Sequence, residues 1–210
     1  MPRSSNWTST CKPSSDDFVG EIIKGGNHLL ALINDVLEMS RIESGTIHLS
    51  IAALDLAAVV EECRALVQPL ADAQGLTLRI AVPPSARVRG DRVRLKQSLL
   101  NLLSNAVKYN REGGAIHLDT EPAADNRLRI TVSDTGRGIP AARMAELFQP
   151  FSRLGAEHGA IEGTGIGLSI TRRLVELMDG SVGAESSPGV GSRFWIELPV
   201  GDTPPTGASR

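Results

Sequence analysis

The stretch "LLNLLSNAVKYN", residues 99–110, combines a leucine-rich helical pattern with polar side chains at regular spacing. Asn101, Asn105 and Lys108 lie four and three residues apart, so they share one face of a helix. Asparagine is unfavourable inside a helix because its amide competes for backbone hydrogen bonds. The two asparagines and the lysine therefore form either a solvated polar face or a binding site.

Two glycine-rich segments follow this stretch. "SDTGRGIP", residues 133–140, comes directly after an expected strand, and "GTGIGLSI", residues 163–170, leads into an expected helix. Gly163, Gly165 and Gly167 allow backbone turns, and free N–H groups at a helix start favour an anion. The segment is either a phosphate-binding loop or a flexible loop. The G-x-G-x-G spacing without a preceding strand excludes a dinucleotide fingerprint, and no P-loop motif occurs.

Asp134 lies at the end of the strand before the first glycine-rich segment. A carboxylate only accepts hydrogen bonds, so it selects a ligand with an amino donor, unless it merely orders a turn. The Asn105 amide oxygen suits Mg²⁺ when a triphosphate supplies the negative charge, and Lys108 can reach a phosphate. Each residue alone favours the structural interpretation, whereas the three segments together favour a nucleotide site.

The three segments together resemble the catalytic ATP-binding domain of two-component sensor histidine kinases, in the GHKL superfamily. "NLLSNAVKYN" matches the N box, "DTGRGIP" the G1 box, "LFQPFSR" the F box and "GTGIGLSI" the G2 box. "SPGVGSRFWIELP" is similar to the closing hairpin of that domain. The resemblance covers about residues 46–200, and "HLLALINDVLEMSRIESG" before it resembles the second helix of the dimerisation and phosphotransfer domain.

The resemblance implies a role for each matching residue. Asn105 would coordinate Mg²⁺ with support from Asn101, and Lys108 would contact phosphates. Asp134 would accept a hydrogen bond from the adenine amino group, and Arg153 would approach the γ-phosphate. The other residues implied in ATP binding are Tyr109, Gly136, Gly138, Phe148, Phe151, Gly163, Thr164, Gly165, Gly167 and Leu168.

A mobile lid is expected over the nucleotide. The resemblance places it at residues 154–163, "LGAEHGAIEG", whose small and polar residues suit a moving loop. Phe148 and Phe151 would anchor this lid, and packing in the core is an equal alternative for both.

The pattern of apolar residues predicts an α+β fold, because helices and strands do not alternate as in a doubly wound sheet. The resemblance implies a GHKL (Bergerat-type) α/β sandwich, with helices on a mixed, mainly antiparallel sheet, preceded by one long helix of a helical hairpin. Asp55 is expected to cap a helix to about Ala73, Asp91 to cap the opening helix, and Pro140 to begin a short helix. The expected strands are residues 46–51, 76–82, 115–121, 127–134, 181–186 and 192–198.

Four segments are expected along the chain. Residues 1–15 form a disordered tail, and residues 16–45 form the second helix of a dimerisation domain whose first helix is absent. Residues 46–200 form the catalytic domain, and residues 201–210 are a loose tail. The long helix carries a wide apolar stripe without a partner helix, which predicts self-association through residues 16–44.

The family's phosphoacceptor motif, similar to S-H-E-[LF]-R-T-P-L, does not occur in this sequence. His117 belongs to a strand, His158 to the lid, and His48 follows the long helix. His28 lacks the acidic residue and the downstream proline, so it is expected on a bundle surface. The acceptor histidine is therefore expected on another chain or a missing segment, and a response regulator as a further partner. A non-catalytic ATP-binding regulatory module and a truncated kinase fragment remain alternatives.

Two other members of the superfamily are less consistent with the residues. ATPases of the gyrase and mismatch-repair type carry a glutamate where this chain has Asn101, and an amide cannot accept a proton from water. A serine kinase of the anti-sigma type is a further alternative, but the long N-terminal helix favours a histidine kinase.

Composition excludes other classes. A net charge of −2, a pI of about 6.1 and 3% aromatic residues argue against nucleic-acid binding. No apolar run approaches the roughly 20 residues that span a bilayer, and the N-terminus is no secretory signal. Cys11 and Cys63 have no metal-binding spacing and are expected to be reduced thiols of a cytoplasmic protein.

Overall fold

The computed structural model describes residues 15–152 and 164–201, so both expected tails and the expected lid lie largely outside the described residues. The helices are α1 Ser15–Glu43, α2 Leu56–Ala73, α3 Arg92–Lys108 and α4 Gly167–Leu177, with a short 3-10 helix, η1, at Ala141–Glu146. The strands are β1 Ala52–Asp55, β2 Thr77–Ala81, β3 Arg87–Gly90, β4 Ala115–Ala123, β5 Arg127–Asp134, β6 Ser181–Ser187 and β7 Gly191–Pro199.

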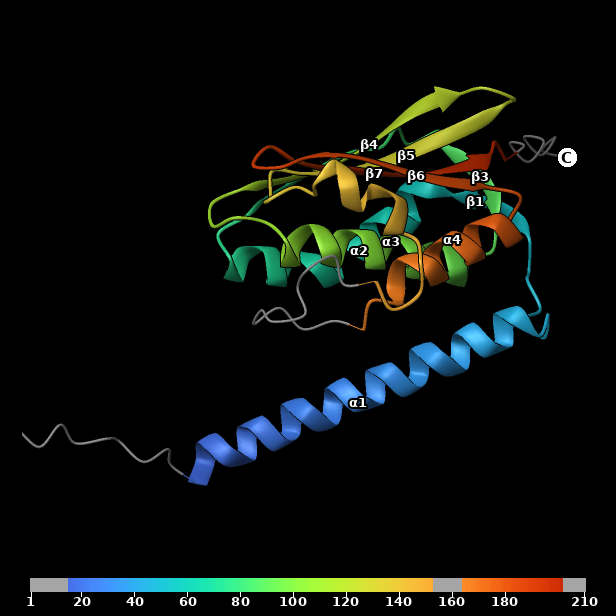
Figure 1. Ribbon diagram of the computed structural model, residues 1–210. Helices are drawn as coiled ribbons and strands as arrows, with labels where there is room; N and C mark the ends of the chain where they lie inside the picture. Colours follow the sequence, from blue (N-terminus) through green and yellow to red (C-terminus); the bar gives the residue numbers. More distant parts are fainter. Residues whose placement is uncertain (1–14, 153–163, 202–210) are drawn as a thin grey trace, which may run out of the picture.

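A five-stranded sheet forms one layer of the molecule, in the order β2-β4-β5-β7-β6. Only the β2–β4 pair in this sheet is parallel, and β1 and β3 form a separate antiparallel pair. Helices α2, α3 and α4 lie side by side along one face of the sheet, with α1 beyond them (Figure 1). This arrangement confirms the predicted α+β sandwich with a mixed, mainly antiparallel sheet.

The core lies between the sheet and the helical layer. Alternate residues of β5 and β7 point into it, and they are Ile130, Val132, Phe194, Ile196 and Leu198. From α3 come the buried residues Leu95, Leu99, Leu102, Leu103, Ala106 and Val107. Because these residues occupy one face of α3, the face with the two asparagines and the lysine is left for the site described below.

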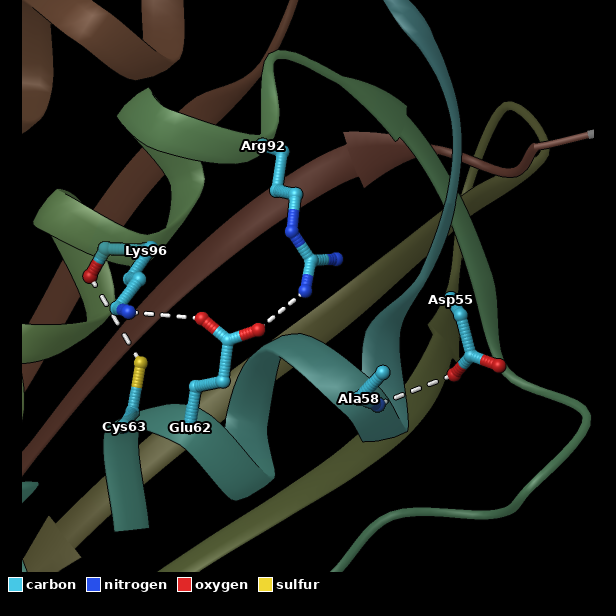
Figure 2. Close-up of polar contacts among 6 residues, drawn as sticks. All are labelled: Asp55, Ala58, Glu62, Cys63, Arg92 and Lys96. Carbon is cyan, nitrogen blue, oxygen red and sulfur yellow. Dashed lines mark hydrogen bonds and ion pairs between the residues drawn. The ribbon is translucent and has the colours of Figure 1, made fainter. Parts of the chain in front are cut away.

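Both predicted helix caps are confirmed. The Asp55 carboxylate accepts a hydrogen bond from the Ala58 N–H at 3.1 Å, at the start of α2 (Figure 2). Asp91 accepts from two N–H groups in the first turn of α3 and from the Ser50 N–H at 2.8 Å. Asp91 thus joins the start of α3 to the segment before β1, and both carboxylates satisfy N–H groups that a helix leaves without partners.

Polar contacts join α2 to α3 (Figure 2). Glu62 pairs with Arg92 and, at 2.7 Å, with the Lys96 ammonium. The neighbouring Cys63 thiol is buried and points toward the Lys96 carbonyl. Burial raises the pKa of Cys63 to about 11, so this residue is a protonated thiol at neutral pH.

Two local predictions were wrong. Residues 46–51 were expected as a strand, but the strand begins at residue 52 and pairs with β3, which the sequence did not indicate. The N–H groups of the segment are used elsewhere: Thr46 donates to Arg41 and Ser50 to Asp91. Pro140 precedes η1 as its N-cap and is not its first residue.

Helix α1 ends at the predicted place and packs on the body of the molecule near that end. Gly45 has a φ of +67°, and the Thr46 N–H bonds the Arg41 carbonyl, which is a Schellman C-cap. Ile42 is only 2% exposed and packs in a small core with α4. Among residues 15–152 and 164–201, no helix combines the length and the apolarity that crossing a membrane requires.

Candidate functional site

A cavity of about 350 Å³ opens between α3, the loop after β5 and the start of α4. It brings together residues from all three segments that the sequence singled out. The predicted site residues that line it are Asn101, Asn105, Lys108, Tyr109, Asp134, Gly138, Thr164, Gly165, Gly167 and Leu168. These segments are far apart in the sequence, so their convergence is a property of the fold.

The two asparagines of α3 differ in their contacts. The Asn101 amide donates a hydrogen bond to the Thr171 hydroxyl of α4 at 2.8 Å, which fixes the orientation of its side chain. A Cβ atom on Gly167 would overlap the Asn101 amide oxygen, so glycine lets α4 approach α3 closely. Within the described part of the chain, the Asn105 side chain makes no hydrogen bond, and its amide is available to a ligand.

Asp134 lies at the end of β5 at the edge of the cavity. Its carboxylate accepts a hydrogen bond from the Gly136 N–H at 2.8 Å. Burial raises the pKa of this carboxyl, and the N–H groups of Gly136 and Ser192 oppose that rise by stabilising the ionised form. A Cβ atom on Gly136 would overlap the Tyr109 carbonyl oxygen, so glycine keeps this loop close to the end of α3.

Two cations lie close to the Tyr109 ring. The Lys108 ammonium lies 5.3 Å from the ring centroid, and the Arg137 guanidinium lies 4.7 Å from it. Both residues line the cavity. Positive charge and an aromatic surface therefore meet at this side of the cavity, as a ligand with a base and phosphates requires.

Some predicted residues lie away from the cavity. Phe148 packs against the main core, whereas Phe151 is 66% exposed, so the core-packing alternative is wrong for Phe151. Gly136 does not line the cavity but shapes the loop behind it. Arg153 and Gly163 lie outside the described residues.

Other lining residues were not predicted: Asp35, Ser104, Arg137, Ile139, Pro140, Leu147, Ser152, Ser192 and Phe194. The helical spacing that identified Asn101 and Lys108 also identifies Ser104, which lies three and four residues from them. Asp35 comes from α1, and its carboxylate accepts a hydrogen bond from the Thr164 hydroxyl at 2.6 Å. No local pattern reveals this contact, because it joins residues 129 positions apart.

The chemistry of the cavity suits an anionic ligand with an amino-bearing base. Asp134 is an acceptor at one side, while Lys108 and the free N–H groups at the start of α4 attract anions. No group of three or more His, Cys, Asp or Glu side chains among the described residues could hold a metal by itself. A cation here therefore needs oxygen ligands from the bound molecule in addition to the Asn105 amide oxygen.

Comparison with known proteins finds a matching family model, similar protein sequences and similar solved structures. The family model described as "Histidine kinase-, DNA gyrase B-, and HSP90-like ATPase" matches residues 90–202. Sensor protein GacS of Pseudomonas syringae pv. syringae is 39% identical over an alignment of 200 positions that covers 90% of this chain and 22% of GacS. The chain thus spans less than a quarter of the length of that relative.

Two solved structures share the fold. Full-length ShkA in complex with AMPPNP has a TM-score of 0.77 and 33% identity, over 91% of this chain and 40% of ShkA. ThkA in complex with the response regulator protein TrrA has a TM-score of 0.70, over 91% of this chain and 53% of ThkA. At 24% identity the second likeness shows the fold alone.

Proposed function

The chain belongs to the family of histidine kinase-, DNA gyrase B- and HSP90-like ATPases, and from this premise we propose that it binds Mg²⁺-ATP and transfers the γ-phosphoryl group to a histidine. The observation that carries this proposal is the convergence of Asn105, Asp134 and Gly165 on one cavity. The fold of histidine kinase catalytic domains supports the choice of reaction, as does the amide at Asn101 in place of a carboxylate base.

The base of the nucleotide would lie at the Asp134 end of the cavity. The ionised carboxylate would accept a hydrogen bond from the adenine amino group, and the Gly136 N–H would keep that carboxylate in place. Tyr109 would pack near the nucleotide, with the Lys108 and Arg137 cations close to its ring. Adenine is thereby favoured over bases that present a carbonyl at the same position.

The phosphates would lie between α3 and the start of α4. The N–H groups at the start of α4 and the Lys108 ammonium would hold phosphate oxygens. The Asn105 amide oxygen fits as a ligand for Mg²⁺, because it is a hard donor without a competing hydrogen bond in the described structure. Bound Mg²⁺ would supply neutralising charge for the phosphates, and this chain's residues would position them.

The acceptor histidine would come from another chain or from a segment outside this sequence. His48 and His117, the histidines whose side chains the structure describes, do not line the cavity. The imidazole nitrogen would form a bond to the γ-phosphorus while the bond to the β-phosphate oxygen breaks and ADP leaves with that electron pair. Arg153 is proposed to approach the γ-phosphate, with Phe148 and Phe151 anchoring a lid at residues 154–163.

The domain assignment follows from the same proposal. Residues 16–45 would be the second helix of a dimerisation and phosphotransfer domain, and residues 46–200 the catalytic domain. The tails would be residues 1–15 and 201–210. Self-association through residues 16–44, a response regulator as partner and a cytoplasmic location are further parts of the proposal, and no nucleic-acid or membrane partner is included.

A regulatory ATP-binding module without kinase activity is the second candidate, because the sequence lacks an acceptor motif. The two functions are separated by supplying an acceptor. We would incubate the chain with γ-labelled ATP, with and without the dimerisation and phosphotransfer domain of GacS, and test the label for acid lability and base stability. A kinase transfers label to the supplied histidine, and its Asn105→Ala variant does not. ATP binding without any transfer would identify the regulatory module.

A further inference from the structure

Helix α1 has two different faces. Asp35, Glu38 and Ile42 are spaced by three and four residues, and this face lies on the body of the molecule. Glu38 accepts hydrogen bonds from Arg94 at 2.6 Å and from Gln97 at 2.5 Å, both on α3. The contacts of this face therefore hold α1 to both α3 and α4.

Asp35 extends this docked face into the cavity. Its carboxylate lines the cavity beside Thr164, the first described residue of the second glycine-rich segment, and accepts the hydrogen bond of the Thr164 hydroxyl. The Thr164 hydroxyl in turn accepts from the Ile166 N–H at 3.3 Å, directly before α4. A negative charge supplied by α1 is thus placed at the end of the cavity where α4 begins.

We propose that Asp35 is a specificity-determining residue of the nucleotide site, which selects against ligands whose negative charge is not neutralised. This inference rests on the proposed binding of ATP. Asp35 lines the cavity in which the phosphates would lie, and like charges in a partly buried site repel one another. Coupling between two binding events is reciprocal. If docked α1 weakens the binding of a metal-free triphosphate by some factor, the bound triphosphate must weaken the docking of α1 by the same factor.

The test is the Asp35→Asn variant, because the Asn amide oxygen still accepts from Thr164 while the charge is removed. We would measure the affinities of adenosine, ADP and a non-hydrolysable ATP analogue by calorimetry in EDTA. The variant is expected to bind the triphosphate roughly five-fold more tightly than the parent chain does. Its affinity for ADP should increase by a smaller factor, and its affinity for adenosine should not change. High salt should reduce the difference between the parent and the variant.

The matched control is Glu43→Gln, which removes the same charge from an exposed residue at the end of α1. It should leave all three affinities unchanged. Equal changes for the three ligands, no change, or weaker binding of the triphosphate to Asp35→Asn would overturn the inference. A parent chain that binds no ATP analogue even with Mg²⁺ would instead refute the proposed function, so the two failures are distinguishable.

Discussion

At the scale of a single residue, the proposed role of Asp134 is to determine which base the site prefers. With GTP, its carboxylate would face the guanine carbonyl, and an unsatisfied buried polar group costs about 1 to 3 kcal/mol. At about 1.4 kcal/mol per tenfold, we expect at least a roughly ten-fold preference for ATP. In Asp134→Asn the difference between the affinities for ATP and GTP should be smaller, because an amide can present a donor to the guanine carbonyl. Displacement of a fluorescent ATP analogue by ATP and by GTP measures both affinities in the parent chain and in the variant. Equal affinities for ATP and GTP in the parent chain would show that Asp134 only orders a turn.

The same preference should depend on pH. Burial raises the pKa of Asp134, so its carboxylate is protonated at a higher pH than that of an ordinary aspartate. As the pH falls through this raised pKa, the carboxyl becomes a weaker acceptor for the adenine amino group and gains an O–H donor that can bond the guanine carbonyl. The ratio of the affinities for ATP and GTP should therefore decrease as the pH is lowered in the parent chain. In Asp134→Asn this ratio should not change with pH.

Asn105 is the residue on which the magnesium proposal depends. Asn105→Ala should remove an oxygen ligand without leaving a core cavity, because the side chain lines an open space. We expect Mg²⁺ to tighten binding of a non-hydrolysable ATP analogue in the parent chain and to do so less in the variant. Calorimetry with Mg²⁺ and with EDTA measures this difference. If a folded variant responds to Mg²⁺ as the parent does, Asn105 is not the ligand.

The individual residues of the site differ in how far the sequence could reveal them. Asn101, Asn105 and Lys108 could be predicted because one helix fixes their spacing, and α3 forms as expected. Arg137 lies between the two glycines of its segment, but its position over the Tyr109 ring depends on how that loop meets α3. Asp35 could not be predicted, because only the packing of α1 brings it to the cavity.

At the scale of an element, the start of α3 depends on one cap. Asp91 is 8% exposed, and its carboxylate accepts from Ser50, Val93 and Arg94 N–H groups. Asp91→Ala should lower the free energy of unfolding by about 1 to 3 kcal/mol, because three N–H groups in partly buried hydrogen bonds lose their acceptor. Asp55→Ala is the matched control, with a smaller expected loss, because the half-buried Asp55 carboxylate accepts only one backbone N–H bond, and its ion pair with Arg87 lies at the surface. Urea unfolding measures both variants.

The contribution of Asp91 also has a defined pH dependence. Burial alone would raise the pKa of its carboxyl, but the backbone N–H donors of Ser50, Arg94 and Val93 outweigh burial and lower it. A lowered pKa in the folded state stabilises the fold above the ordinary aspartate pKa, and this contribution is lost as the pH falls through the folded value. The difference in unfolding free energy between the parent and Asp91→Ala should therefore shrink in acid. If the difference in unfolding free energy between the parent and Asp91→Ala stays constant as the pH falls, the ionised Asp91 carboxylate is not the source of the stabilisation.

Elements with strong local signals could be predicted from the sequence, and those without could not. Caps at Asp55 and Asp91 and a glycine at residue 45 mark three helix boundaries at the places where the structure has them. Residues 46–51 alternate as a strand does, yet a strand needs a partner with free N–H and C=O groups. That partner, β3, pairs with residues 52–55 instead, and its four-residue length gives little periodicity to detect.

At the scale of the whole molecule, the outer face of α1 is the feature from which we predict how the chain behaves in solution. The face opposite Asp35 and Ile42 carries large apolar side chains that remain exposed: Ile22, Ile23, Leu29, Leu30, Ile33, Val36 and Leu37. Each is between 47% and 73% exposed, and large exposed apolar patches drive association. The docked face is already occupied, so this outer face is the one available to a second copy.

We therefore expect the chain to self-associate through residues 16–44 in a concentration-dependent way. Sedimentation analysis of the full chain should show dimers or larger species, and Leu30→Lys with Leu37→Lys should shift the chain to monomers, because both charges lie on the outer face. Replacing the exposed Val190, which lies between β6 and β7, by Lys is the control for a general gain of charge and should leave association unchanged. A full chain that stays monomeric at high concentration would show that the apolar face of α1 alone does not bind a second copy.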